Sequence, residues 1–294
     1  MKRYLFLTLV GVMMVLGANA QEEWRLDSII VEDDAQVRLS KTWYEYNSKQ
    51  QVESEFETDY EDGEEVTYRT VYTYDKNGQI KFIQMAQNGK IIQELEVTAT
   101  DPATGLPTVY IIKAIDNFSE VLSLNSKLEL IYSNGQLVET KDYRYAGQNK
   151  GQDVFNLLTY TLHTYNDKNQ MVEEKLILCR DGKEIDYRTT TYEYDDHGNV
   201  TKEVVENYMG DLSTTNYTNT YDENGNLKKV RTTAAGASAT NELYFWSKFP
   251  SSGINGVKVK KVLSDWYDLN GKRLNGKPTT KGVFIQNGKK VMVK

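Results

Sequence analysis

The chain has 294 residues, a formal net charge of −7, only 4 prolines and 26% charged residues. This composition predicts a globular protein rather than a disordered one. The single cysteine, Cys179, excludes an internal disulfide. The excess of acidic residues argues against a nucleic-acid-binding protein, which needs a positive face for phosphates.

Residues 1–20 have the pattern of a secretory signal peptide. Two basic residues, Lys2 and Arg3, precede an apolar run over residues 5–16, and small residues flank Asn19. This pattern predicts cleavage between Ala20 and Gln21. The apolar run is too short to span a bilayer, and no later stretch is apolar enough to cross one. We therefore expect an exported chain without a transmembrane span after signal removal.

A motif of Tyr-Asp-x-x-Gly recurs along residues 41–235. Its clearest copies begin at Tyr74, Tyr194 and Tyr221, and weaker copies begin at Tyr46, Tyr132 and Tyr165. Tyr46 to Tyr74 is 28 residues, Tyr165 to Tyr194 is 29, and Tyr194 to Tyr221 is 27. A fixed period in this range indicates a repeat architecture.

Each repeat is typical of a β-hairpin. An Asp side chain can accept hydrogen bonds from the turn backbone, and Gly adopts the positive φ that the turn requires. The predicted turn residues are Asp75, Gly78, Asp195, Gly198, Asp222 and Gly225. Residues 66–74 alternate β-branched and aromatic side chains, as in a strand. One extra residue before Tyr192, relative to the copy at Tyr72, predicts a β-bulge near residues 189–191.

The predicted fold is therefore all-β, with antiparallel β-hairpin repeats of period about 27–33 residues across a domain at 21–250. Such hairpins give more strands than an open twisted sheet carries comfortably. We expect a long curled sheet, a roll or a shell, followed by a small C-terminal β segment.

The units at Tyr74, Tyr194 and Tyr221 resemble YD repeats of the Rhs type. In large members of that family such hairpins spiral into a closed β-shell around a toxic enzyme. This chain has few copies and no toxin domain, so the resemblance implies hairpin geometry and an exported setting, not encapsulation.

The tail, residues 251–294, differs from the body in charge. From Gly256 onward it has 10 basic and 2 acidic residues, whereas residues 21–255 have 23 basic and 40 acidic, a net charge of −17. The segments at residues 266–274, 278–285 and 287–294 resemble the end of a type IX secretion sorting domain of Bacteroidetes. That resemblance implies contact between the tail and secretion machinery; the alternative is a final β-meander that belongs to the fold.

The sequence offers no catalytic, cofactor or metal motif. Cys179, His163 and His197 are the residue types of a thiol nucleophile and base. However, Cys179 lies in an apolar strand, and His197 occupies a turn position that is Asn in the copies at residues 77 and 224. Two His and one Cys far apart have no zinc spacing. We expect no cofactor, no metal and no enzymatic activity.

Rows of tyrosines are the remaining candidates for function. Partly exposed, they would stack on a ligand, whereas buried they would stabilise the sheet by cross-strand pairing. The candidates for ligand stacking are Tyr68, Tyr72, Tyr74, Tyr192, Tyr194, Tyr217 and Tyr221.

The leading hypothesis is an exported, non-enzymatic β-repeat protein at the cell surface or outside the cell, which binds a glycan or a protein. The alternatives are an enzyme in a cleft of the rolled sheet, and a structural component of the envelope, with a periplasmic location if the chain is not exposed.

Signal cleavage is tested by intact-mass spectrometry of the protein from the native cell envelope and culture supernatant. We expect a mature chain that begins at Gln21, because the small residues at 18 and 20 suit signal peptidase. Retention of Met1 in the mature protein would contradict this expectation.

Overall fold

The structure is a computed structural model. It describes residues 24–61, 64–116 and 120–248, together with the short strands at 266–267, 273–274, 282–286 and 289–293. The predicted signal peptide, with Ala20 and Gln21, lies outside the described residues. No helix long and apolar enough to cross a membrane occurs in the described part of the chain.

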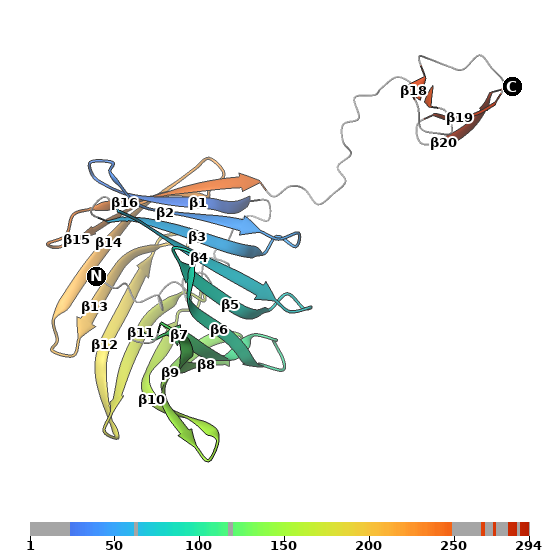
Figure 1. Ribbon diagram of the computed structural model, residues 1–294. Coiled ribbons are helices and arrows are strands. Elements are labelled where there is room, and N and C mark those ends of the chain that lie inside the picture. The colour runs from blue at the N-terminus through green and yellow to red at the C-terminus, as the bar shows by residue number, and fades with distance from the viewer. Residues whose placement is uncertain are drawn as a thin grey trace. The chain divides into compact units, whose positions relative to one another are not determined.

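Sixteen antiparallel strands form one sheet. They are β1 (Trp24–Asp33), β2 (Arg38–Tyr46), β3 (Val52–Glu61), β4 (Glu64–Tyr74), β5 (Ile80–Gln87), β6 (Lys90–Thr100), β7 (Pro107–Ile115), β8 (Leu122–Ser133), β9 (Gln136–Asn149), β10 (Gln152–Tyr165), β11 (Met171–Arg180), β12 (Lys183–Tyr194), β13 (Val200–Asn207), β14 (Leu212–Tyr221), β15 (Leu227–Ala234) and β16 (Thr240–Lys248). Each strand pairs with its neighbour in sequence, as in a meander (Figure 1).

The sheet closes on itself, because β16 pairs with β1. Side chains join the same seam. Arg25 Nε donates to Ser247 Oγ over 3.1 Å, and Ser247 Oγ donates to Asp27 over 2.8 Å. The all-β, antiparallel part of the prediction is confirmed, but the open curled sheet is wrong. Closure satisfies the backbone groups that two free edges would leave unpaired.

The sequence period corresponds to two strands and two turns. Alternate turns therefore lie at the same end of the barrel, and all the Tyr-Asp turns follow even-numbered strands. We call this end the motif rim and the end formed by turns after odd-numbered strands the apolar rim. At the motif rim an Asx side chain accepts two backbone N–H bonds in the turns that begin at Asn47, Asp75, Asp101, Asn166, Asp195 and Asp222.

The predicted turn glycines lie at the positive-φ position of these turns. Gly78, Gly198 and Gly225 have φ of 83°, 86° and 80°. A Cβ at Gly78 would also come within 3.0 Å of the Gln51 side chain, which belongs to the neighbouring turn. Gly at this position therefore satisfies both the turn conformation and the spacing between turns.

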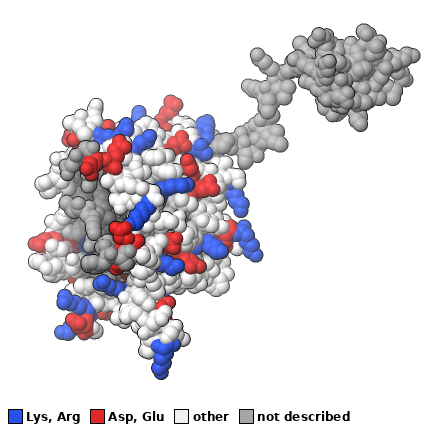
Figure 2. All heavy atoms as spheres, viewed as in Figure 1, with Lys and Arg blue, Asp and Glu red and all other residues white. Residues whose placement is uncertain are grey.

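Alternation along the strands separates two faces. The buried face turns inward, and on β3–β8 it forms an apolar core of Val52, Tyr72, Ile83, Leu95, Tyr110, Ile112, Leu128 and Leu130. The outer face carries intermingled charges (Figure 2). Ion pairs on it include Lys127–Glu129 at 2.6 Å and Lys202–Glu193 at 2.8 Å. The wall therefore has a partly apolar interior and a charged exterior.

The tyrosine that begins the motif fastens neighbouring strands at the motif rim in four of its copies. Its hydroxyl donates to a backbone carbonyl near the start of the preceding strand. These bonds join Tyr46 to Leu26, Tyr74 to Val52, Tyr165 to Leu137 and Tyr194 to Met171, and Trp246 Nε1 makes the equivalent bond to Leu227. The motif is thus a turn signal combined with a strand-to-strand fastening.

Register shifts interrupt the ladders at defined places. Opposite Leu176 and Ile177 of β11, strand β12 has one extra residue, Tyr187. This position is two residues before the segment in which the sequence predicted a bulge. The β9–β10 pair has two further shifts, one of which leaves Leu158 without a partner on β9.

The chain divides into two compact units, Met1–Ser247 and Lys248–Lys294. In the second unit four short strands pair in the order β18-β17-β19-β20, with β17 (Trp266–Tyr267), β18 (Arg273–Leu274), β19 (Gly282–Gln286) and β20 (Lys289–Val293). The predicted boundary at residues 250 and 251 lies outside the described residues and stays a prediction.

The Tyr194→Phe substitution tests the rim fastening. It keeps the ring but leaves the Met171 carbonyl without its donor, so the free energy of unfolding should fall by about 1 kcal/mol. Urea denaturation measures the change. The control is Tyr208→Phe, because the Tyr208 hydroxyl bonds to no described residue; equal losses in both variants would contradict the assignment.

Candidate functional site

The tyrosines predicted to stack on a ligand take part in hydrogen bonds within the wall. Tyr72 donates to Glu55 over 2.9 Å, Tyr192 donates to Glu174 over 2.6 Å, and Tyr217 lies 3.4 Å from Glu203. Tyr74 and Tyr194 bond to backbone carbonyls, Tyr221 donates to Asp195, and Tyr68 accepts a bond from Gln87. These residues lie on β4, β12 and β14, so they do not form one continuous stripe. A stacking role for them stays a prediction.

A chain of polar contacts crosses four strands on the inner face. Thr140 Oγ1 lies 3.0 Å from His163 Nε2, and His163 Nδ1 lies 3.2 Å from Glu174, which also accepts the Tyr192 hydroxyl. Burial opposes ionisation of Glu174, but the bonds from His163 and Tyr192 outweigh it and lower the pKa of this carboxyl. The buried ring of His163 is therefore held on both sides.

The pKa values of other carboxyls on the inner face are raised rather than lowered. Burial raises the pKa of Glu55, and the hydrogen bond from Tyr72 offsets only part of the shift. Burial likewise raises the pKa of Glu203 and of Asp142. The inner wall thus contains carboxyls whose pKa is lowered and carboxyls whose pKa is raised.

Cys179 and the two histidines do not form a common site. Cys179 is five residues from Glu174 along β11, or about 17 Å, and it pairs with Glu184 of β12. Burial and the charge of Glu184 raise the pKa of the Cys179 thiol, which disfavours a thiolate. His197 stacks on Tyr221 at the motif rim, with ring centroids 3.9 Å apart. Among the described residues, no three His, Cys, Asp or Glu side chains gather as a metal site requires.

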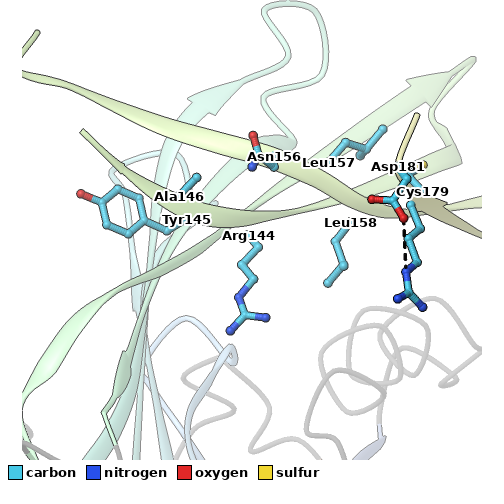
Figure 3. A pocket seen from close by; sticks show the side chains of 9 residues that line it. Arg144, Tyr145, Ala146, Asn156, Leu157, Leu158, Cys179 and Asp181 are labelled. Carbon is cyan, nitrogen blue, oxygen red and sulfur yellow. Dashed lines mark ion pairs between the residues drawn. The ribbon is translucent and has the colours of Figure 1, made fainter. Parts of the chain in front are cut away.

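A cavity of about 440 Å³ lies beside the ends of β9, β10 and β11. Its lining includes Arg144, Asn156, Leu158, Cys179, Arg180 and Asp181. Figure 3 shows the Arg144 and Leu158 side chains pointing to the same side of the sheet, with the Arg180–Asp181 ion pair on the next strand end. The ladder of β10 with β11 begins only at Thr159, so the β9–β10 hairpin projects beyond β11 and leaves a step.

Exposed apolar side chains concentrate at the apolar rim. Of thirteen exposed large hydrophobic residues in the described part of the chain, nine lie within five residues of its turns: Val37, Leu39, Ile91, Val121, Ile185, Tyr187, Tyr208, Met209 and Leu212. Tyr187 and Tyr208 stack with centroids 5.8 Å apart and an interplanar angle of 10°. They are 44% and 57% exposed. Contiguous exposed apolar side chains mark interaction surfaces, and the Tyr187–Tyr208 pair is in contact here.

These residues were not predicted from the sequence, because the repeated motif marks only the turns at the other rim. One local signal was present. Asn207 accepts backbone bonds from Met209 and Asp211, so residues 207–211 form an Asx turn. Tyr208 and Met209 are large apolar residues at its tip, where polar ones are usual.

No protein-family model and no curated protein matches the sequence. Among solved structures, the chain is similar to a porin-like protein from Bacteroides uniformis, with 10% identity, a TM-score of 0.46, and coverage of 76% of this chain and 98% of that protein. A DUF3836 family protein from Parabacteroides distasonis has 15% identity, a TM-score of 0.23 and coverage of 37% and 88%. A protein of unknown function from Bacteroides fragilis has 12% identity, a TM-score of 0.24 and coverage of 49% and 86%.

The family assignments predicted from the sequence are wrong. No family model matches, and the sixteen strands form one closed antiparallel barrel in consecutive order, which gives no evidence for a YD-repeat protein. The motif Tyr-Asp-x-x-Gly does not identify a family here, because its residues are explained by the hairpin turn and by the tyrosine hydrogen bond at the rim. The sorting-domain resemblance of the tail likewise finds no support.

The raised pKa of Glu55 predicts a pH dependence of stability. A carboxyl whose pKa is raised on folding binds protons more tightly in the folded state, so its contribution to stability is lost as the pH rises above its unfolded value. Glu55→Gln keeps an acceptor for Tyr72 and removes this loss. We expect the variant to gain stability over the wild type from pH 5 to pH 8 in urea unfolding.

The matched control is Glu53→Gln, because Glu53 is exposed on the same strand. A gain in the free energy of unfolding that is the same at pH 5 and pH 8, or that is equal in Glu55→Gln and Glu53→Gln, would contradict the assignment.

Proposed function

We propose that the protein is an exported, non-enzymatic β-barrel that binds a glycan or protein ligand at the cell surface. The ligand would dock on the apolar rim between β9 and β14. The observation that carries this proposal is the difference in exposed apolar side chains between the two rims, since nine of the thirteen in the described part of the chain lie at the apolar rim.

The stacked pair of Tyr187 and Tyr208 is the centre of the proposed surface. Both rings are exposed, and each has limited conformational freedom because it stacks on the other. Tyrosine presents a large amphipathic area at low entropic cost, which suits it to recognition. Met209 and Leu212 extend the apolar area, at 67% and 69% exposure.

The polar groups of the inner wall support a non-enzymatic role. Tyr72, Tyr192 and Tyr217 are bonded to carboxyls on adjacent strands, and His163 is held between Thr140 and Glu174. A general base needs hydrogen-bond reach to a substrate proton. The three hydroxyls and Nε2 of His163 instead bond to other groups of the wall, which accounts for their burial without a reaction.

The charges of the outer wall support a barrel surrounded by water. Lys127, Lys202 and their acidic partners lie within strands, on the outward face. A wall that faces lipid has an apolar band at these positions. These charges support the part of the proposal in which the barrel lies outside the bilayer.

The Tyr187→Ala, Tyr208→Ala double variant tests the proposal. Truncating a central aromatic pair should weaken ligand binding about tenfold or more. Labelled full-length mature protein is applied to glycan and extracellular-protein arrays, and its hits are titrated with each variant. Phe245→Ala is the control, since Phe245 is 46% exposed but lies on β16, away from the apolar rim. A ligand that binds all three proteins equally would place the site elsewhere.

A further inference from the structure

The cavity at the step between β10 and β11 has a charge opposite to that of the body around it. Arg144 and Arg180 line it, whereas residues 21–255 have a net charge of −17 from 23 basic and 40 acidic residues. Two guanidinium groups beside one cavity are therefore a local exception to the acidic surface.

Both guanidinium groups are available to a ligand. Arg144 is exposed and forms no ion pair with a described residue. Arg180 approaches Asp181 at 3.7 Å, and these side chains are 76% and 90% exposed. An exposed pair at this distance contributes little, so an incoming anion can replace it. Figure 3 shows Arg144 directed to the same side of the sheet as Leu158, and both residues line the cavity.

The remaining lining suits a ligand that has polar and apolar parts as well as an anionic group. Asn156 supplies an amide, and Leu158, which points to the same side of the sheet as Arg144, supplies apolar area. Arg180 pairs with Lys183, and Tyr187 lies four residues further along β12, or about 13 Å away. A short oligosaccharide can span from the arginines to the Tyr187–Tyr208 pair.

We propose that this cavity binds the acidic group of an anionic polysaccharide. The inference rests on the proposed function and names its ligand class. The planar guanidinium group of Arg144 forms two parallel hydrogen bonds to a carboxylate or sulfate group, and Arg180 supplies a second positive charge. Uncharged sugar rings of the same chain stack on Tyr187 and Tyr208. Carboxylate and sulfate sugars share this chemistry, and the experiment separates them.

Binding of defined oligosaccharides to the full-length mature protein tests the inference. The probes are an oligogalacturonide, a sulfated dextran oligosaccharide and a neutral dextran oligosaccharide of equal length, measured by isothermal titration calorimetry at two salt concentrations. We expect one of the charged probes to bind more tightly than the neutral probe, with an affinity that falls as salt rises.

Arg144→Gln and Arg180→Gln should each weaken binding of the charged probe, about tenfold for Arg144→Gln, without changing any binding of the neutral probe. Arg38→Gln is the matched control, because Arg38 is an exposed arginine at the apolar rim on β2. It should leave both affinities unchanged.

Three results would overturn the inference. If charged and neutral probes bind equally and the Tyr187→Ala, Tyr208→Ala variant loses both, the proposed binding function survives and the anionic ligand does not. An acidic peptide that binds more tightly than any sugar and depends on Arg144 would replace the ligand class. If no charged sugar binds, an anionic polysaccharide is excluded as the ligand. The protein array then still tests the proposed binding function.

Discussion

The barrel depends on hydrogen bonds from tyrosine hydroxyls to backbone carbonyls at the motif rim. Each bond joins the end of an even-numbered strand to the start of the strand before it, next to a turn that an Asx side chain stabilises. A phenol is long enough to reach the neighbouring strand while its ring covers the inner wall. This geometry explains why tyrosine outnumbers phenylalanine by 21 to 8 in the chain.

The same arrangement leaves the two rims of the barrel with different side chains. Side chains at the motif rim are used in turns and fastenings, so few remain for a ligand. At the apolar rim the turns vary in length and sequence, and large side chains such as Tyr208 and Met209 stand exposed. Because hydrogen bonds hold one end of the barrel, the turns at the other end can vary in length and sequence, as loops on rigid frameworks commonly do.

The local part of the fold was predictable from the sequence, and the closed architecture was not. Alternation and the Asp75-x-x-Gly78 pattern are short-range signals, so the hairpins followed from them. Closure depends on the pairing of β1 with β16, the first and last strands of the barrel, which no period in the sequence records. The candidate site escaped prediction because Arg144 and Arg180 belong to different hairpins, and only the bulged ladder of β9 and β10 places them beside one cavity.

The seam between β1 and β16 has a consequence for how the molecule is made. Its two strands are the first and the last of the barrel, so the ring cannot close until the whole of β16 is available. A chain that ended before Thr240 would expose the backbone edges of β1 and β15, and such edges pair readily with other chains. The last strand therefore protects fifteen others from aggregation, although it supplies only 9 residues.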